Sequence, residues 1–326
     1  MNTPPFHRHR RLRSNPLCLE MVADVILHRN HFIYPVFITT GKNQKNPIPS
    51  MAGIFQLSGK YLLEEIESCL KAGINKFLLF GIPSQKDPIG SDTWNSKGVI
   101  QSSLQILRKK FPEAYLISDI CFCEYTDHGH CGILNKENYL ENDFTLKNLA
   151  LQAVSHAEAG AHLLAPSGML DGMVSTIRAA LDNKGFSELP IMSYAVKYAS
   201  SFYGPFRNAA GTSLKSGDRK THQMNPRNGF WEALSEAEED IRQGADIIMV
   251  KPAMPNLDIL SGLRGKINAP LAAYQVSGEF NMLKNAVLRN DLNEDAIVES
   301  LISIKRAGAG IIISYFSKEL AVKGVI

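Results

Sequence analysis

Three cysteines and two histidines lie within one short stretch, DICFCEYTDHGHCG, at positions 119–132. Cys121 and Cys123 are two residues apart, so on an extended strand their side chains point to the same face. The glycines on either side of Cys131 allow the chain to turn back and bring a third thiol to the other two. Thiolate sulfur binds zinc at about 2.3 Å, and the company of acidic residues and histidines favours a metal site over three buried apolar cysteines.

The number of ligands decides what kind of metal site this is. A fourth ligand from His128 or His130 would close the site and make it structural. Three sulfurs and one water would instead leave an open position for catalysis. The residues by themselves leave both alternatives open.

Two lysines follow apolar runs directly, Lys197 in SYAVK and Lys251 in DIIMVK. A lysine at the end of a strand is most often a solvated surface charge. Here each lysine continues a buried run, so both are expected at the same end of the sheet. In a desolvated pocket, one ammonium lowers the pKa of the other, and a neutral lysine amine can attack a ketone.

Eight short apolar runs supply the elements that must position these groups. They are residues 31–39, 76–82, 114–122, 162–168, 189–196, 246–253, 270–278 and 310–316. Continuous apolar runs of this length are typical of strands buried on both faces, and segments with helical spacing separate them. Strand followed by helix, eight times, predicts an α/β protein with a (β/α)8 TIM barrel. The alternative is a doubly wound open sheet, but no GxGxxG follows the first strand.

Active sites of such barrels lie at the C-terminal ends of the strands. Reading those ends gives Asp119, Cys121, Cys123, Ser167, Lys197, Lys251, Ser277 and Tyr315. The one long interruption, residues 198–230, is rich in Gly, Ser, Arg and Asn. A connection of that length within a compact domain indicates a functional loop, here an active-site lid.

The composition of the whole chain narrows the class of protein. Its 326 residues are 44% hydrophobic and 21% charged, with a net charge of +3, and no apolar run approaches the length of a membrane helix. Five cysteines do not indicate a disulfide framework, so we expect a cytoplasmic protein. Residues 1–30 form a basic arm, more consistent with subunit contacts than with nucleic acid, and residues 31–326 form the catalytic barrel.

Five segments together resemble one family. They are DICFCEYTDHGHCG, IMSYAVKYASSFYGPFR, GDRKTHQMNP, GADIIMVKPAMPNLDI and YQVSGEF. In this order they resemble porphobilinogen synthase, also called 5-aminolevulinate dehydratase, over almost the whole chain. The resemblance implies a TIM-barrel lyase of tetrapyrrole (heme) biosynthesis. It condenses two molecules of 5-aminolevulinate to porphobilinogen, with loss of two waters, and assembles as a homo-octamer through the N-terminal arm.

The resemblance also implies residue roles. Lys251 and Lys197 match the lysines that form Schiff bases with the first and second substrates. Ser277 and Tyr315 match the groups that hold the carboxylate of the first substrate, and Asp119 and Ser167 are candidates for catalytic support. Residues that match the second substrate's carboxylate site are Arg207, Arg219 and Gln223.

The same resemblance implies two metals. Cys121, Cys123 and Cys131 match the zinc-binding triad of the zinc-dependent branch, with an open position near the second substrate's amine. Glu232 is the candidate for a carboxylate that binds an allosteric, activating magnesium ion. Two other interpretations stay open at this stage. One is a class I aldolase-like barrel with one Schiff-base lysine and a structural zinc, and the other is a zinc-stabilised module whose basic arm binds nucleic acid.

Overall fold

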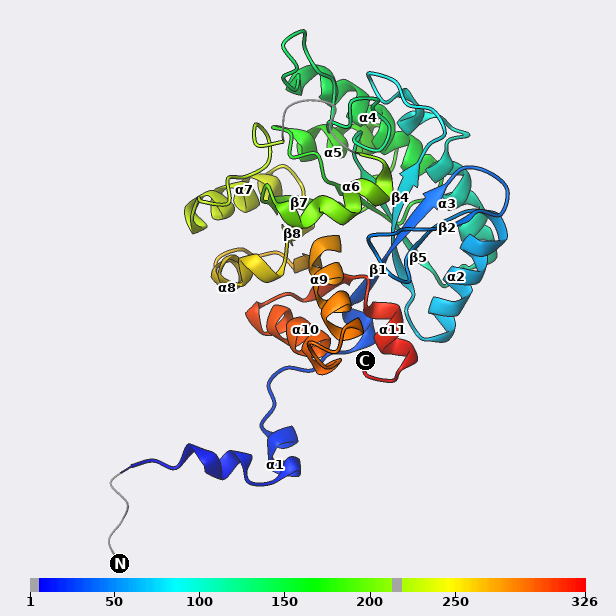
Figure 1. Ribbon diagram of the computed structural model, residues 1–326. Helices are drawn as coiled ribbons and strands as arrows, with labels where there is room; N and C mark the ends of the chain where they lie inside the picture. The colour runs from blue at the N-terminus through cyan, green and yellow to red at the C-terminus, as the bar shows by residue number, and fades with distance from the viewer. Residues whose placement is uncertain (1–5, 213–218) are drawn as a thin grey trace, which may run out of the picture.

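The computed structural model describes residues 6–212 and 219–326, and eight parallel strands form its centre (Figure 1). They are β1 (Phe32–Thr39), β4 (Lys76–Ile82), β5 (Tyr115–Ile120), β6 (Leu163–Pro166), β7 (Met192–Lys197), β8 (Ile247–Lys251), β9 (Leu271–Gln275) and β10 (Ile311–Ser314). Seven fall within one of the eight predicted apolar runs, and β7 extends one residue beyond the run 189–196, to Lys197. Their order in the sheet is β6-β5-β4-β1-β10-β9-β8-β7.

The two ends of this order also meet. Leu164 in β6 forms a parallel bridge with Ile191, which directly precedes β7, and the backbone N–H of Leu164 donates to Pro190 O at 3.1 Å. This contact makes the sheet a nearly closed barrel. The TIM-barrel prediction is therefore confirmed, and the doubly wound open sheet was the wrong alternative.

Helices follow the strands and surround the barrel. They are α2 (Gly59–Lys71), α3 (Val99–Lys110), α4 (Asn142–Glu158), α5 (Met173–Asn183), α7 (Phe230–Arg242), α8 (Leu257–Arg264), α9 (Ser277–Leu288), α10 (Asp295–Ala307) and α11 (Ser317–Val322). In α2, Leu62, Ile66 and Cys69 are buried, as the predicted helical spacing requires. Gly73 follows the helix at φ +86°, where its backbone N–H donates to Leu70 O, so this residue ends the helix as predicted.

The strands are buried on both faces, because side chains fill the barrel and helices cover it. Every residue of β7 and β9 is buried. A fully buried Leu, Ile or Phe side chain contributes about 1.5–3 kcal/mol, so the apolar runs both specify and stabilise this barrel. Polar side chains at the strand ends are thus held on a rigid frame.

The segment between β7 and α7 is only partly irregular. It contains the 3₁₀ helix η4 (Ser201–Tyr203) and helix α6 (Gly204–Ala210). Phe206 of α6 packs against Phe37 of β1 and Phe80 of β4, which places this helix over the barrel. Of the predicted lid, residues 198–230, the part from 213 to 218 lies outside the described residues.

Some further elements were not expected from the sequence. A small hairpin of β2 (Lys45–Pro47) and β3 (Phe55–Leu57) pairs with β1. Single turns of 3₁₀ helix are η2 (Arg29–His31), η3 (Ser91–Trp94) and η5 (Met254–Asn256).

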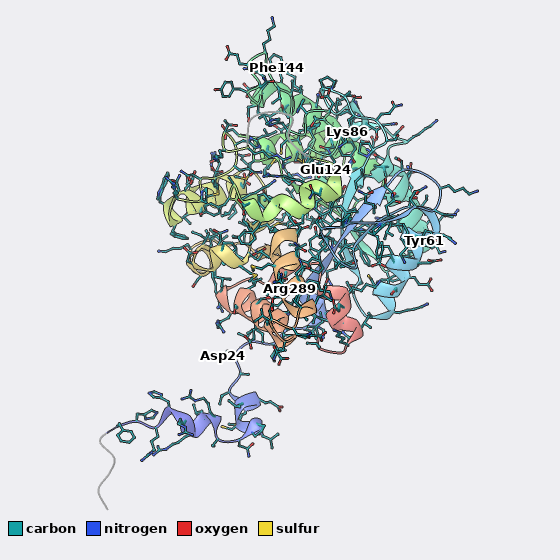
Figure 2. The ribbon with its side chains drawn as sticks, in the orientation of Figure 1. Asp24, Tyr61, Lys86, Glu124, Phe144 and Arg289 are labelled. Atoms are coloured by element: carbon teal, nitrogen blue, oxygen red, sulfur yellow. The ribbon has the colours of Figure 1, made fainter. Side chains whose placement is uncertain are left out.

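The N-terminal arm points away from the barrel (Figure 1). It consists of η1 (His9–Arg13) and α1 (Pro16–Met21), neither of which has a buried residue, and residues 1–5 lie outside the described part. Asp24 lies where the arm leaves the barrel, and the segment before it stands clear of the other elements (Figure 2). Apolar side chains such as Leu17 and Met21 are more than 70% exposed. Within the described residues, no helix is long and apolar enough to cross a membrane.

Candidate active site

The cysteines lie beyond the strand rather than on it. Strand β5 ends at Ile120, so Cys121 and Cys123 belong to the loop that follows, and the prediction of an extended strand through both residues was wrong. Their side chains nevertheless converge, with 3.4 Å between the two Sγ atoms. The Gln152 side chain of α4 donates to Cys121 O at 3.0 Å and fixes the loop from behind.

The three thiols form a compact buried cluster. The Sγ atoms of Cys121, Cys123 and Cys131 all lie within 4.8 Å of one another. A tetrahedral zinc with bonds of about 2.3 Å separates its sulfurs by about 3.8 Å, so the donor set fits this metal. No histidine of residues 6–212 or 219–326 belongs to the cluster, and the His128 ring lies instead within hydrogen-bonding distance of Pro88 O and His130 N.

One buried cation, Arg219, lies beside the cluster. The Arg219 guanidinium is buried and donates to Gly129 O, within the cysteine loop, at 2.6 Å. Hydrogen bonds from the thiols of Cys121 and Cys123 lower the pKa of Cys131 well below its usual value, and Arg219 lowers it further. Burial lowers the pKa of Arg219, but the neighbouring thiolates outweigh it and raise that pKa overall. Cys131 is therefore the thiol that most readily becomes a thiolate, the form that binds metal, whereas hydrogen bonds within the cluster and burial raise the pKa values of Cys121 and Cys123.

Glu124 is a residue of this site that the sequence analysis did not assign. Its carboxylate is buried in the interior of the molecule (Figure 2) and accepts from the Cys123 thiol at 3.1 Å. Burial, and then the charge of Cys121, raise its pKa to about 7. The sequence feature that could have identified Glu124 is its position directly after Cys123 in DICFCEYTDHGHCG.

The two predicted lysines lie side by side. In the parallel pairing of β7 with β8, Lys197 is the register partner of Lys251, and both side chains are buried. The Lys197 ammonium donates to Ser167 O, beyond β6, at 2.5 Å. Their proximity follows from strand register, which the sequence could only suggest.

Lys251 has a strongly perturbed environment. Burial, and then the charge of Lys197, lower the pKa of Lys251 to about 7. Aromatic rings surround its Nζ, with centroids at 4.4–5.5 Å, and belong to Tyr194, Tyr203, Phe206 and Tyr274. A large fraction of Lys251 is therefore neutral near pH 7, although the rings also favour the cation.

Asp119 and Ser167 meet beside the lysines. Asp119 Oδ2 accepts from Ser167 Oγ at 3.2 Å, while Asp119 Oδ1 is buried without a hydrogen-bond partner. Burial, and then Glu124 and Cys121, raise the pKa of Asp119 well above its usual range. A carboxyl group with a raised pKa can hold a proton near neutral pH.

A small buried cavity joins the thiol cluster to the lysines. Its walls are Phe80, Asp119, Cys123, Glu124, Ser167, Lys197, Tyr203, Phe206, Arg219 and Lys251. Two amines, one thiol, two carboxyl groups and an arginine thus line one small space at the C-terminal end of the barrel. Such an arrangement suits imine chemistry on a carbonyl compound that carries a carboxylate.

Ser277 and Tyr315 do not line this cavity, but each contacts a residue whose ring also contacts Lys251. Ser277 is the first residue of α9 rather than the last of a strand, and its Oγ accepts from Phe206 N at 2.9 Å. Tyr315 directly follows β10, and its hydroxyl lies 3.0 Å from that of Tyr274, a ring that also contacts Lys251. Both residues therefore lie on the Lys251 side of the barrel mouth.

Arg207 and Gln223 lie farther from the lysines. Arg207 is half-buried on α6, where burial, and then the Arg219 charge, lower its pKa. Gln223 is buried, and neither atom of its amide group has a hydrogen-bond partner. The charge of Arg219 acts on Arg207, so the structure places two cationic groups near each other, and their role in binding a carboxylate stays a prediction.

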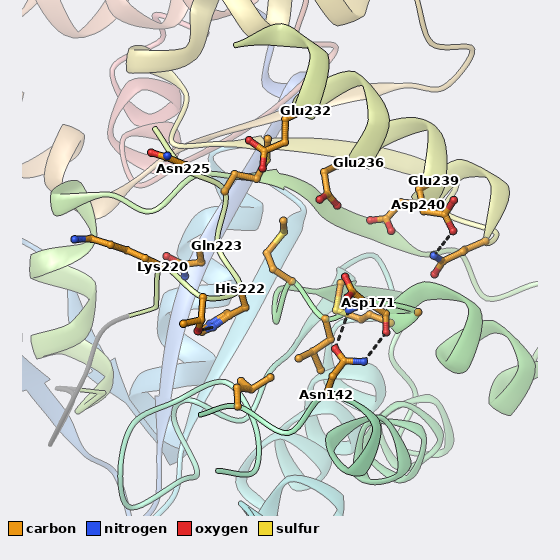
Figure 3. Close-up of a pocket in the computed structure, with 18 of the residues that line it drawn as sticks. Asn142, Asp171, Lys220, His222, Gln223, Asn225, Glu232, Glu236, Glu239 and Asp240 are labelled. Atoms are coloured by element: carbon orange, nitrogen blue, oxygen red, sulfur yellow. Dashed lines mark hydrogen bonds between the residues drawn. The ribbon is translucent and has the colours of Figure 1, made fainter. Parts of the chain in front are cut away.

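Glu232 belongs to a different and larger cavity of about 650 Å³ (Figure 3). It lies in the first turn of α7, and Glu236 and Asp240 follow it along the same helix. Asp171 faces these carboxylates across the cavity, and Gln223 lines the same space (Figure 3). Burial, and then the neighbouring carboxylates Asp240, Asp171 and Glu232, raise the pKa of Glu236 to about 7.

Comparisons with known proteins agree with this geometry. The model of the family described as Delta-aminolevulinic acid dehydratase matches residues 6–323. The delta-aminolevulinic acid dehydratase of Archaeoglobus fulgidus is 49% identical over 319 residues, 98% of each chain. That of Bacillus subtilis is 46% identical over 317 residues, 97% of each. The Toxoplasma gondii ME49 enzyme, solved in complex with the reaction product porphobilinogen, is similar with a TM-score of 0.96 at 39% identity. That match covers 98% of this chain and 92% of the other.

These similarities extend over the whole barrel and confirm the predicted activity, that of porphobilinogen synthase, a hydro-lyase. They exclude the aldolase-like enzyme and the nucleic-acid-binding module as alternatives. A buried cluster of three cysteines is also the feature expected of a zinc-binding member. The chain belongs to the delta-aminolevulinic acid dehydratase family.

Proposed function

We propose that this chain condenses two molecules of 5-aminolevulinate through two Schiff bases, the first on Lys251 and the second on Lys197. The observation that carries this assignment is the register pairing of two buried lysines in one cavity. A single Schiff base would need one such lysine. Two amines at this spacing suit two ketone substrates held side by side.

Lys251 is the better nucleophile for the first step, because burial and Lys197 lower its pKa to about 7. Its neutral amine adds to the ketone carbon of the first substrate, and the oxygen leaves as water. The resulting imine withdraws electrons from the adjacent carbon, which can then lose a proton and form a carbon–carbon bond. Asp119 and Ser167 face this space and are placed to hold and return protons.

Substrate carboxylates need cationic or hydroxyl partners. Ser277 and Tyr315 would bind the carboxylate of the first substrate on the Lys251 side of the barrel. Arg207, Arg219 and Gln223 would bind that of the second, and a guanidinium offers a carboxylate two parallel hydrogen bonds. We also assign residues 198–230 as a lid over the barrel formed by residues 31–326.

The metal at the cysteine cluster is proposed to be zinc. Cys121, Cys123 and Cys131 would hold it as thiolates, and Arg219 would offset the negative charge of the cluster. Bound zinc supplies a Lewis acid with one open position for an amine or water. The residues themselves exclude water from the cavity and keep one thiol deprotonated.

Three further assignments concern regulation and assembly. Glu232, in a cavity rich in carboxylates, would bind an activating magnesium ion. Residues 1–30 would make the subunit contacts of a homo-octamer, which is consistent with the exposed apolar side chains of the arm. The enzyme would act in the cytoplasm.

Borohydride reduction in the presence of 5-aminolevulinate tests the central assignment. We expect a covalent adduct on Lys251, located by peptide mapping, and no turnover in Lys251→Met. Lys266→Met, at an exposed position on the outside of the barrel, is the matched control and should be fully active. An adduct elsewhere, or turnover in Lys251→Met, would show that the assignment is wrong.

A further inference from the structure

One fully buried carboxyl group, that of Glu279, joins the ends of two barrel strands. Its Oε1 accepts from the backbone N–H of Met254, which follows β8, at 2.5 Å. Its Oε2 accepts from the backbone N–H of Val276, which follows β9. One side chain therefore holds two neighbouring strand exits at the end of the barrel where the cavity lies.

The two exits carry groups that must be placed relative to each other. Lys251 is the last residue of β8, three positions before Met254. Ser277 directly follows Val276. A shift of either exit would change the distance between the amine that attacks the ketone and the hydroxyl that holds the carboxylate.

The exit of β9, where α9 begins, also contacts helix α6. A shift of this exit would therefore also move α6. Ser277 Oγ accepts from Phe206 N at 2.9 Å. A side chain at Gly278 would meet Phe202 O at 2.4 Å, which shows how closely η4 approaches the start of α9. The Phe206 ring, in turn, lies 5.5 Å from Lys251 Nζ.

We propose that Glu279 is a positioning residue that sets the separation between Lys251 and Ser277 by holding the exits of β8 and β9 together. The proposal rests on the roles assigned above to Lys251 and Ser277. Glu279 does not face the cavity and has no part in the proposed chemistry. Because a misplacement of about 1 Å can reduce a rate about 100-fold, such a remote clamp has a measurable effect.

Two substitutions distinguish a need for two hydrogen-bond acceptors at this position from a need for its negative charge alone. In Glu279→Gln, the amide nitrogen cannot accept, so one of the two backbone donors loses its partner in either orientation of the amide. In Glu279→Asp, both oxygens remain acceptors, but the side chain is one methylene shorter and cannot reach both exits. The clamp model therefore predicts defects in both variants, whereas a need for negative charge alone predicts rescue by aspartate.

A control variant is available at the opposite end of the same strand. Asp246 precedes β8, and its Oδ2 accepts from Ile191 N, which precedes β7, at 2.8 Å. Asp246→Asn therefore weakens a carboxylate–backbone contact between two strands, but at the N-terminal end of the barrel. It controls for any general loss of barrel stability.

The experiment compares the three variants with the unchanged full-length enzyme, using thermal unfolding, KM and kcat for 5-aminolevulinate, and the rate of borohydride trapping at Lys251. We expect the trapping rate to fall and KM to rise at least tenfold in Glu279→Gln and Glu279→Asp, while Asp246→Asn stays within twofold per folded molecule. If Glu279→Gln unfolds, Glu279→Asp provides the same comparison.

Trapping and KM within twofold of the unchanged enzyme in folded Glu279 variants would overturn the proposal, even if their melting temperature falls. So would full rescue by aspartate. A missing Lys251 adduct in the unchanged enzyme would instead overturn the Schiff-base assignment. In that case KM still tests the placement of Ser277 by Glu279: a rise confined to the Glu279 variants supports that part of the proposal, and no rise overturns it.

Discussion

Replacing Lys197 by methionine should move Schiff-base formation at Lys251 to higher pH. Lys251 attacks only as a neutral amine, and its pKa is lowered to about 7, first by burial and second by the charge of Lys197. The substitution leaves the burial and removes the repulsion, so the pKa of Lys251 must rise. At a fixed pH near 7, less of the amine is then neutral.

The size of this shift follows from the pairing of the two residues on β7 and β8. Two charges on the order of 7 Å apart, at an effective dielectric constant of about 20, interact by about 2 kcal/mol, or about 1.5 pKa units. The midpoint should move from about 7 to roughly 8.5. The neutral fraction at about pH 7 then falls from about one half to about 3%, so trapping slows about 15-fold there and recovers above about pH 9.

The assay is borohydride trapping of 5-aminolevulinate on Lys251, measured over a series of pH values and quantified by peptide mapping. Lys197→Arg is the matched variant, because it removes the same amine but keeps a positive charge. Its midpoint should stay near that of the unchanged enzyme. Equal midpoints for Lys197→Met and Lys197→Arg would refute the electrostatic argument, whichever direction both moved.

Four further predictions use other parts of the molecule. Chelation, or Cys123→Ala, should abolish turnover while circular dichroism shows an intact barrel; unfolding on metal removal would indicate a structural ion. Limited proteolysis should cut within residues 198–230, and 5-aminolevulinate should slow the cutting, whereas equal rates would argue against a lid. Glu232→Gln should lose stimulation by added magnesium, and stimulation of unchanged size would contradict the assignment. Deleting residues 1–27 should reduce the assembly size seen by light scattering, and an unchanged octamer would locate the contacts elsewhere.

The barrel could be predicted because its strands are buried on both faces. Runs such as 189–196 and 310–316 contain almost only apolar residues. Such a run can be recognised from the local sequence alone, without knowing which strands pair with it. The hairpin β2–β3 could not be predicted in the same way. Its strands, Lys45–Pro47 and Phe55–Leu57, are three residues each and depend on pairing: β3 pairs with β1, and β2 pairs with β3.

The candidate site likewise contains features that the local sequence predicts and features that depend on contacts between distant segments. Lys197 and Lys251 could be placed at one end of the barrel because each ends an apolar run. Their exact partners depend on strand register, which two isolated runs do not determine. The cysteines converge for a different reason from the predicted one: the turn after Ile120, and not an extended strand, brings Cys121 and Cys123 together.

Arg219 shows why long-range contacts escape a sequence pattern. By itself it is one charge in the loop SGDRK, for which solvation is the simplest expectation. The folded chain instead buries it and hydrogen-bonds it to Gly129 O, ninety positions earlier and between Cys123 and Cys131 of the thiol cluster. One guanidinium thus offsets the charge of the thiolates and is also the proposed partner of a substrate carboxylate. Because a thiolate cluster and a carboxylate compete for the same positive charge, binding of a divalent metal, which would offset most of the thiolate charge, should leave Arg219 more available to the substrate.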